Sequence, residues 1–487
     1  MNYDVIIVGA GPAGYFSAYE LIEKNPNLKI LLIDKGRDIL KRKCPVLEHK
    51  IDKCPANKDG YRECFPACSI TNGFGGAGAY SDGKFNITTD YGGWLTDYLT
   101  KDQLMNLIDY VDEINLKFGA TKVITDPDTP KVREIELRAM AAGLKLLKGK
   151  VRHLGTEENL KILTKIFNYL SNKIEMKFGT EVKDIVVEDN KVTGVELPDG
   201  TKLSAKYVVL VVGREGSAWL SNILESKGVT MDQTQVDIGV RVECPNLIMD
   251  EINKNLYEGK FVYKTTNGNT VRTFCSNPGG HVVMENYEGV VNVNGHSYSD
   301  SKLLSDNTNF ALLVTHHFSE PFKSPNEYAK KVSSLANQLA CGSIIVQRYG
   351  DILLGRRSTE KRINEGFVVP TLKEAVPGDL TLVLPHKTMA SIIEMIKVLD
   401  KVTPGIASQH TLLYGVEAKY YSSRPKIKNT LEVEKISNLY VGGDGAGITR
   451  GLAQAGASGV YIARNILEGM KKWDTSEHHQ KVLDYQF

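Results

Sequence analysis

The sequence predicts an α/β protein, in which a Rossmann-like parallel sheet is combined with a second, inserted α+β domain. Residues 3–34 read as strand, glycine turn, helix and strand, which is a βαβ unit. Residues 174–213 read as successive short strands, typical of a β-meander. Residues 438–467 return to strand, glycine turn and helix. Between the meander and this last segment, long β runs of a different character predict the second domain.

The length and composition indicate a folded protein of two domains. The chain has 487 residues, of which 42% are hydrophobic and 24% charged, and this excludes disordered and fibrous classes. We expect one domain from residues 1–224 and 405–487, interrupted by a Cys- and Gly-rich insertion at 35–86. Residues 225–404 would form the inserted substrate domain.

The charge balance and the cysteines suggest a cytoplasmic protein that does not bind nucleic acid. Sixty Lys and Arg residues against 58 Asp and Glu residues give a net charge of +2, so no general attraction to polyanions is expected. Seven cysteines are few and odd in number, which argues against a secreted disulfide framework. The N-terminus has no basic segment typical of a signal peptide. The longest apolar runs, Val5–Val8 and Val208–Val212, are too short to span a bilayer.

The first glycine turn carries a dinucleotide-binding fingerprint. Gly9, Gly11 and Gly14 form G-x-G-x-x-G directly after the strand 3–8 and before a helix that ends near residue 25. The first glycine permits the tight turn, the second lets the backbone approach a pyrophosphate, and the third allows close helix–strand packing. Asp34 follows 20 residues beyond Gly14, where a carboxylate binds a ribose hydroxyl.

The middle of the chain alternates helices and strands. Helical spacing covers 94–118, 133–148 and 156–173. Strand patterns follow, with turns predicted at Asp189-Asn190 and Asp199-Gly200. These strands cover residues 174–178, 182–189, 191–197, 200–205, 207–213, 236–243, 260–275 and 281–294. Near the C-terminus, the helix 453–467 contains small residues that permit close packing.

Several motifs together resemble a known family. VIIVGAGPAG…LLID, YVVLVVGREGS and LYVGGDGAGITRGLAQAGASGVYIARNI are similar to the FAD-binding domain of two-dinucleotide-fold flavoproteins. CxxxCSIxxGFGGAGAYSDGKFN, VDIGVRVE, RTFCSNPGGHV, VNGHS, VQRYGDILLGRRS and YGVEAKYYS resemble the uncharacterised bacterial FAD-dependent dehydrogenase family. The resemblance implies a glutathione-reductase-type FAD domain, split around a substrate domain, and leaves the substrate open.

The resemblance also implies a set of FAD-binding residues. The N-terminal glycines would hold the pyrophosphate, Asp34 the ribose, and Val182 the adenine through its backbone. Asp444 would bind the ribityl or pyrophosphate end, and the helix that follows would face the flavin N1/O2 edge, where reduced flavin carries negative charge. The full set is Gly9, Gly11, Pro12, Ala13, Gly14, Asp34, Lys35, Val182, Gly213, Gly443, Asp444, Gly447, Thr449, Arg450 and Gly451.

The insertion at 35–86 contains a second glycine motif and four cysteines. Gly73–Gly78 also fits G-x-G-x-x-G, but neither a strand precedes it nor a helix follows it, so it predicts a loop beside the flavin. From that loop Ser81, Asp82 and Lys84 could contact flavin or substrate, although a plain loop is the alternative. Cys44, Cys54, Cys64 and Cys68 fit neither a zinc nor an iron–sulfur template, so no metal site is predicted. Ordinary thiols, a redox-active pair and, as the least favoured alternative, a metal or cluster site remain open.

Candidates for acid–base or substrate-binding roles lie in the second domain and near its end. Arg272, Cys275, Asn277, Gly279 and Gly280 occupy one stretch that is predicted to form a turn, and His296 a tight turn. Of His316 and His317, which alternate in a strand, at most one can face a pocket. Glu417 and Lys419 would share a strand face as an acid/base pair or a salt bridge, and Arg450 could clamp an anionic substrate or the cofactor.

These observations predict an FAD-dependent oxidoreductase that transfers a hydride between flavin N5 and a small organic substrate. NAD(P)H or a protein partner as the electron donor stays open. The two alternatives are a flavin-dependent RNA-modifying enzyme, which the small net charge disfavours, and a flavin and thiol redox sensor without catalysis.

Overall fold

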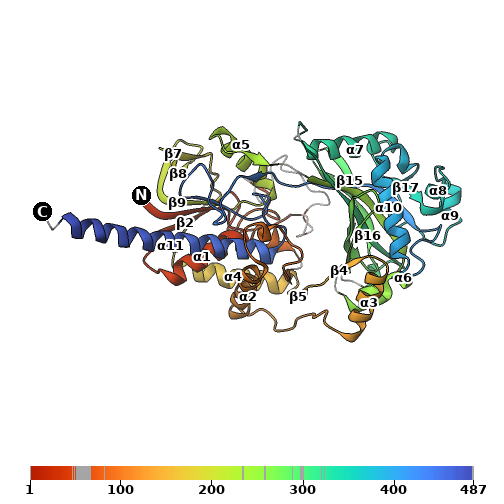
Figure 1. Cartoon of the computed structure of the whole chain (residues 1–487), viewed down its shortest axis with the longest axis horizontal. Helices are drawn as coiled ribbons and strands as arrows, with labels where there is room; N and C mark the ends of the chain where they lie inside the picture. Colours follow the sequence, from red (N-terminus) through yellow and green to blue (C-terminus); the bar gives the residue numbers. More distant parts are fainter. Residues whose placement is uncertain are drawn as a thin grey trace. The chain divides into compact units, whose positions relative to one another are not determined.

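The computed structural model describes residues 2–484 except 46–47, 49, 51–66, 82, 233–234, 257–258, 288, 297–300, 320 and 323. The chain forms two compact units, each with its own hydrophobic core. Unit 1 contains Met1–Thr125, Gly149–Asp232 and Ser422–Phe487, and unit 2 contains Asp126–Lys148 and Gln233–Tyr421. Figure 1 shows the chain from red at the N-terminus to blue at the C-terminus.

Unit 1 is built on a seven-stranded sheet. Six of its strands follow the order β6-β2-β1-β9-β8-β7, and the seventh, β21, also pairs with β9. Its central strands β2, β1 and β9 and the flanking β6 and β21 run parallel. The strands are β1 (Asn2–Val8), β2 (Ile30–Asp34), β6 (Glu175–Phe178), β7 (Asp184–Glu188), β8 (Lys191–Glu196), β9 (Lys202–Leu210) and β21 (Leu439–Val441). Val5 to Ile7 and Leu31 to Ile33 are completely buried, as expected for strands covered on both faces.

Strand β9 joins the β-meander to the parallel sheet. Its first part pairs antiparallel with β8, and its last three residues pair parallel with β21. The predicted Asp189-Asn190 turn links β7 to β8, and both residues have positive φ, as a two-residue hairpin of type I′ requires.

The helices of unit 1 are α1 (Pro12–Lys24), α2 (Lys101–Lys117), α4 (Thr156–Ser171), α5 (Ser217–Ser226) and α11 (Leu452–Asp484). Small residues permit one close contact among them, between α1 and α11. Helix α11 runs beside α1 (Figure 1). A Cβ atom at Gly459 would overlap the carbonyl oxygen of Ala13, so only glycine permits this approach. Two small sheets complete the unit, β3 (Lys84–Ile87) with β5 (Lys150–His153), and β10 (Met231–Asp232) with β20 (Arg424–Pro425).

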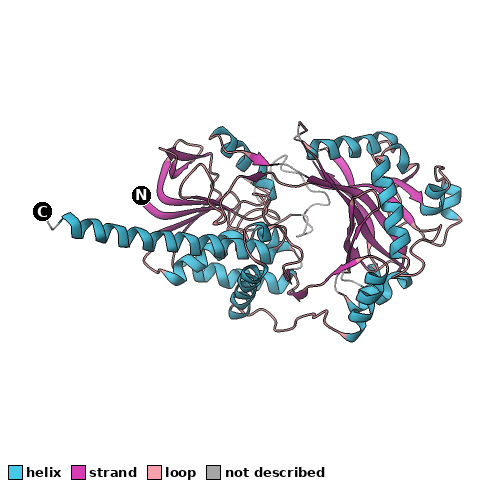
Figure 2. Cartoon of the chain, viewed as in Figure 1, coloured by secondary structure: helices cyan, strands magenta, loops and turns pink. Residues whose placement is uncertain are grey.

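Unit 2 is an eight-stranded sheet with the order β18-β17-β19-β11-β16-β13-β12-β4 (Figure 2, magenta). The strands are β4 (Lys145–Leu147), β11 (Gln235–Pro245), β12 (Lys260–Lys264), β13 (Thr270–Asn277), β16 (Asn307–His317), β17 (Ile345–Arg348), β18 (Val376–Pro377) and β19 (Leu412–Lys419). The hairpin of β14 (His281–Tyr287) and β15 (Val290–His296) is separate. The helices are α3 (Pro130–Ala141), α6 (Asn246–Asn255), α7 (Pro325–Leu339), α8 (Tyr349–Leu353), α9 (Glu360–Asn364) and α10 (His386–Leu399).

The central strand β11 divides its side chains between an apolar and a polar face. Val236, Ile238, Val240 and Val242 are completely buried in the core that includes α10. The intervening positions Asp237, Arg241 and Glu243 are equally buried, although they are ionisable. Because side chains alternate along a strand, the second face of this sheet carries a buried charged layer.

The structure differs from the predicted elements and boundaries at several places. The predicted strand 260–275 is two strands, β12 and β13, and the predicted strand 281–294 is likewise two, β14 and β15. The helix predicted over 133–148 ends at Ala141, because β4 follows and pairs with β12. The strands predicted over 200–205 and 207–213 form the single strand β9. The helix predicted from residue 94 begins at Lys101, after the Thr100 cap.

A further difference concerns the domain boundaries. Unit 2 extends to Tyr421 rather than residue 404, because β19 pairs with β11 and β17. It also takes in Asp126–Lys148, while residues 225–232 belong to unit 1. Among the helices of the described residues, even the long α11 lacks the combination of length and apolar composition that a membrane span needs.

Candidate functional site

The carboxyl ends of three parallel strands lie in register in unit 1. Val8 of β1 pairs with Leu210 of β9, and Leu210 pairs with Val441 of β21. The fingerprint turn, the turn after β9 and the C-terminal turn therefore begin side by side. In open α/β sheets this edge is where ligands bind.

Two glycines of the fingerprint are required by packing within the protein. A Cβ atom at Gly9, whose φ is +106°, would lie 2.6 Å from the carbonyl oxygen of Val211. A Cβ atom at Gly14 would overlap the carbonyl oxygen of Gly9. These positions bring strand, turn and helix together, as the sequence predicted.

Three other glycines at this edge are not required by packing within the protein. A Cβ atom at Gly11 would meet only the Cα atom of Gly76, at 3.9 Å, and at Gly213 and Gly451 it would meet nothing within 4 Å. Gly11 and Gly213 have φ values of −72° and −76°, which any residue adopts. Each of these glycines follows one of the three strands that end in register. A ligand that approaches the backbone here explains all three.

The N-terminus of helix α1 is also suited to bind an anion. Helix α1 starts after Gly11 without a side-chain cap, and its first turn holds no acidic residue. Pro12 occupies the first helical turn, where its missing N–H costs nothing, and the buried Ala13 follows it. The free positive end of the helix dipole suits a phosphate group.

Asp34 organises the turn around the fingerprint. Its Oδ2 accepts the N–H of Ala10 at 2.8 Å, and its Oδ1 accepts the N–H groups of Gly36 at 2.7 Å and Gly73 at 2.9 Å. A carboxylate has about four acceptor positions, so one remains on Oδ2. The proposed ribose contact is thus compatible with a structural role that the sequence did not reveal.

The second glycine motif lies directly against the first. Gly75 donates its N–H to the carbonyl oxygen of Ala10 at 2.8 Å, and a Cβ atom at Gly76 would be 3.1 Å from the Cα atom of Gly11. A short 3₁₀ turn follows over Gly76–Tyr80. Arg42, which is buried, fixes this segment by donating to the carbonyl oxygens of Ser69, Phe74 and Ile70. Burial lowers the pKa of Arg42 to about 10.

Asp444 is the polar centre of the C-terminal turn. Thr449 donates its hydroxyl to Oδ1 at 2.6 Å. Burial raises the pKa of Asp444, although this hydroxyl and the neighbouring Arg214 and Arg450 act against that shift. Gly443 and Gly447 shape the turn with positive φ values of 72° and 68°. The sequence-predicted residues Asp444, Thr449 and Arg450 are therefore brought together.

A loop that the sequence did not single out pairs with this turn. Arg450 donates its N–H to the carbonyl oxygen of Gly92 at 2.7 Å, and Gly93 forms a β-bridge with Thr449. Gln454 donates to the carbonyl oxygen of Tyr91 at 2.9 Å, while its buried Oε1 has no hydrogen-bond partner among the described residues. The Gly92-Gly93 dipeptide is the sequence feature from which this contact could have been predicted.

Other predicted residues of unit 1 lie further from the register. Lys35 pairs with Glu215 at 3.1 Å, and Val182 is buried after β6. Lys84 lies on β3, opposite His153 of β5. Cys44 and Cys68 are free, half-buried thiols, and Cys54, Cys64 and Asp82 lie outside the described residues. Among the residues that the structure describes, no group of three His, Cys, Asp or Glu is arranged to hold a metal ion.

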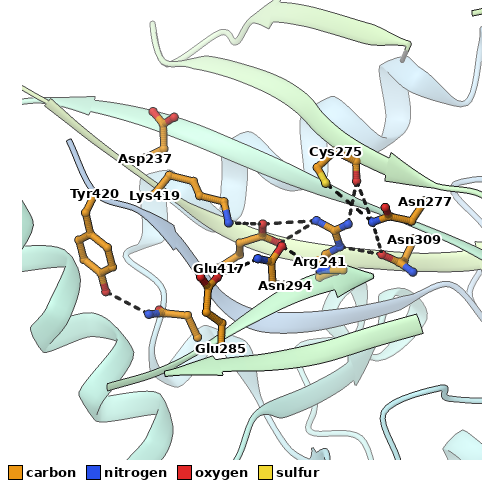
Figure 3. Close-up of polar contacts among 12 residues, drawn as sticks. Asp237, Arg241, Cys275, Asn277, Glu285, Asn294, Asn309, Glu417, Lys419 and Tyr420 are labelled. Atoms are coloured by element: carbon orange, nitrogen blue, oxygen red, sulfur yellow. Dashed lines mark hydrogen bonds and ion pairs between the residues drawn. The ribbon is translucent and has the colours of Figure 1, made fainter. Parts of the chain in front are cut away.

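In unit 2, the predicted pair Glu417 and Lys419 joins a residue that the sequence analysis did not select. Lys419 Nζ lies 3.1 Å from Glu417 Oε1, and Arg241 Nη1 lies 3.4 Å from both carboxylate oxygens. Figure 3 shows Lys419 and Arg241 approaching the Glu417 carboxylate from two sides. The salt-bridge geometry left open by the sequence is therefore present. The sequence feature that could have singled out Arg241 is the alternation of charged and apolar residues in the strand VDIGVRVE.

Two further acids of β11 accept hydrogen bonds from neighbouring side chains. Asp237 accepts hydrogen bonds from Arg272 and Tyr421 through Oδ2. Glu243 accepts the hydroxyl of Tyr414 at 2.5 Å. Burial raises the pKa of Glu243 despite this bond.

Two predictions about turns in unit 2 are wrong. His296 is the last described residue of β15 rather than part of a tight turn, because the hairpin continues through its pairing with His281. Arg272, Cys275 and Asn277 lie in β13, and only Gly279 and Gly280 belong to the turn after it. His316 packs toward α10, where Thr388 is 3.1 Å from its Nε2, and burial lowers its pKa.

Two family models match parts of this chain, and one of them falls within a single unit. Residues 235–420, which lie within unit 2, match the family "FAD-dependent protein, C-terminal domain-like". Residues 371–474 match "Glucose inhibited division protein A". An uncharacterised protein of Clostridium beijerinckii is 29% identical over 489 residues, which cover 95% of this chain and 80% of the relative.

Three oxidases are among the solved structures that match over most of this chain. Glycine oxidase from Bacillus cereus is 13% identical, with a TM-score of 0.33, and 96% of this chain and 97% of that chain are covered. Pyridoxine 4-oxidase from Mesorbium loti is 12% identical, with a TM-score of 0.41 and coverage of 95% and 99%. Formate oxidase from Aspergillus oryzae is 13% identical, with a TM-score of 0.44 and coverage of 97% and 99%. Scores this low transfer no activity to this chain.

Proposed function

We propose that this chain, a member of an uncharacterised family of FAD-dependent proteins, is an oxidoreductase that transfers a hydride between the N5 atom of FAD and an organic substrate. The observation that carries the proposal is the set of open glycines at the strand edge of unit 1. Gly11, Gly213 and Gly451 have room for a side chain, and the sequence nevertheless keeps glycine at each.

The residues at this edge fit the different parts of FAD. The uncapped start of α1 would receive the pyrophosphate, because the helix dipole places partial positive charge there and no acidic side chain lies in the first turn. Asp444 and Thr449 would hold the ribityl side of the cofactor through hydrogen bonds. Asp34 retains one acceptor position for the ribose. FAD, when bound, supplies the hydride chemistry, while the protein supplies orientation and electrostatics.

The C-terminal turn would stabilise negative charge on the cofactor. Helix α11 begins at Leu452, directly after the open Gly451, so its positive end lies at the same edge as the fingerprint. Arg450 and Arg214 add cationic charge near Asp444. Such a setting favours the reduced, anionic cofactor and therefore favours hydride uptake.

The experiment that tests the proposal is anaerobic mixing of the purified, FAD-loaded protein with NADH and, separately, with NADPH. We propose NAD(P)H as the electron donor for the flavin, so we expect the visible absorption of oxidised flavin to be lost with one of the two. Dithionite serves as the control that the bound flavin can be reduced. Bleaching by dithionite alone would remove NAD(P)H from the proposal and assign electron donation to the substrate. A colourless protein that cannot be loaded with FAD would overturn the cofactor itself.

A further inference from the structure

The Arg241 guanidinium is held entirely by the protein. It is completely buried in β11 and donates from Nε to Asn309 at 2.9 Å and from Nη2 to the carbonyl oxygen of Cys275 at 2.7 Å. Its remaining nitrogen, Nη1, faces Glu417 of β19. A Cβ atom at Gly295 of the hairpin would overlap this guanidinium, so Gly295 covers it closely. Arg241 therefore fixes the Glu417 carboxylate and is itself not accessible.

The buried cluster of Arg241, Glu417 and Lys419 carries an excess positive charge. Glu417 supplies one negative charge, and both Arg241 and Lys419 are paired with it. The nearest acid in the sheet register, Asp237 opposite Lys419, is already bonded to Arg272 and Tyr421. Burying a charge without a counter-charge is costly, so this arrangement favours a negative group from outside.

Lys419 is the member of the cluster that such a group can reach. The side chains of Arg241 and Glu417 are 0% exposed, and that of Lys419 is 16% exposed. An ammonium group has three N–H donors. Glu417 is its one hydrogen-bond or ion-pair partner within the part of the chain that the structure describes. Donors thus remain on an ammonium whose position Glu417 has already fixed.

We propose that Lys419 binds the carboxylate of the substrate, which makes the substrate class an organic acid; the word substrate here rests on the proposed function. A single carboxylate balances the single excess charge of the cluster. A phosphate group, which carries more than one negative charge at neutral pH, would overcompensate it. Glu417 is then a positioning residue for the lysine, and Arg241 a positioning residue for Glu417.

The test measures binding of acetate and benzoate to the FAD-loaded protein by calorimetry, with acetamide and benzamide as uncharged counterparts. We expect the carboxylates to bind and the amides not to bind. Lys419→Met removes the charge at similar length and should weaken carboxylate binding at least about tenfold. Lys419→Arg keeps the charge and should retain most of the binding. Lys264→Met, at an exposed lysine of β12 in the same sheet, should behave like the unmodified protein.

Three results would overturn the proposal: equal affinity for acids and amides, unchanged affinity in Lys419→Met, or no carboxylate binding at all. Lys419→Met leaves a neutral Arg241–Glu417 pair, so its unfolding midpoint in anion-free buffer should not fall; this measurement separates a loss of binding from misfolding. Flavin content is read from the absorbance of each sample. Lys419-dependent carboxylate binding by a protein that retains no FAD would support the anion site and contradict the proposed oxidoreductase function. Retained FAD without such binding would support the cofactor and contradict the anion site.

Discussion

At the scale of single residues, glycines in one motif serve different purposes. Gly14 is required because a side chain would overlap the backbone of Gly9. Gly11 has an ordinary backbone conformation and open space around it. The sequence predicted both roles from their spacing, and the structure supports the difference through the surroundings of each residue.

This difference can be measured with the variants Gly11→Val and Gly14→Ala. Valine suits the extended conformation before Pro12, so we expect the FAD-free Gly11→Val protein to unfold within about 1 kcal/mol of the original. It should nevertheless lose FAD, because its side chain fills the space next to the backbone. Gly14→Ala should lower the free energy of unfolding by about 1–3 kcal/mol without any cofactor. Urea unfolding of the FAD-free proteins and FAD retention on gel filtration measure the two effects. Normal FAD retention by Gly11→Val would contradict the assignment of this turn.

At the scale of elements, the first and last helices of unit 1 depend on each other. Helix α1 carries the fingerprint turn, and α11 packs on it through Gly459 and Gly456. The small residues of the C-terminal helix were visible in the sequence as a packing face. Their partner was not visible, because the strands that precede the two helices, β1 and β21, start 437 positions apart, at Asn2 and Leu439. These strands come together only because both pair with β9.

The variants Gly459→Ala and Gly469→Ala form a matched pair within α11. At Gly459 the new Cβ atom would overlap the Ala13 carbonyl oxygen, so the free energy of unfolding should fall by about 1–3 kcal/mol. At Gly469 it would meet only the Tyr207 hydroxyl, at 3.4 Å. There the gain in helix propensity should leave stability unchanged or raise it by up to about 1 kcal/mol. Chemical denaturation compares the two, and equal effects would show that α11 does not pack on α1 in this way.

At the scale of the whole molecule, the chain places its proposed cofactor site and its buried charged cluster in different units. The open glycines belong to unit 1, and Arg241, Glu417 and Lys419 belong to unit 2. Each unit has its own core. The match to a family of FAD-dependent proteins confirms the resemblance seen in the sequence, and its family model matches residues 235–420, which lie in unit 2.

The tryptophans allow the two units to be followed separately. Trp94, Trp219 and Trp473 are the three tryptophans of the chain, and all belong to the segments of unit 1. At a concentration 100 times its dissociation constant, FAD should stabilise the unit that binds it by about 2.7 kcal/mol. We expect FAD to raise the midpoint of the transition seen by tryptophan fluorescence. Far-UV circular dichroism detects the unfolding of both units. The transition that it detects and tryptophan fluorescence does not should stay unchanged, because that transition reports unit 2. Equal shifts of both transitions would mean that the units unfold together.

The sequence by itself determined the βαβ unit, the β-meander and the glycine fingerprint. These depend on neighbours in the chain: hydrophobic runs of strand length, glycines at fixed spacing, and the Asp189-Asn190 turn. The extent of unit 2 was less accessible, because β19 and β4 join its sheet by pairing with strands far away in the chain.

Only the tertiary structure decided which charges meet. Arg241 and Glu417 are 176 positions apart, and their strands become neighbours through the antiparallel pairing of β11 with β19. In the sequence, Glu417 and Lys419 form a plausible pair that balances in charge. Adding Arg241 leaves one positive charge uncompensated, and this excess follows from strand order, which no local pattern encodes.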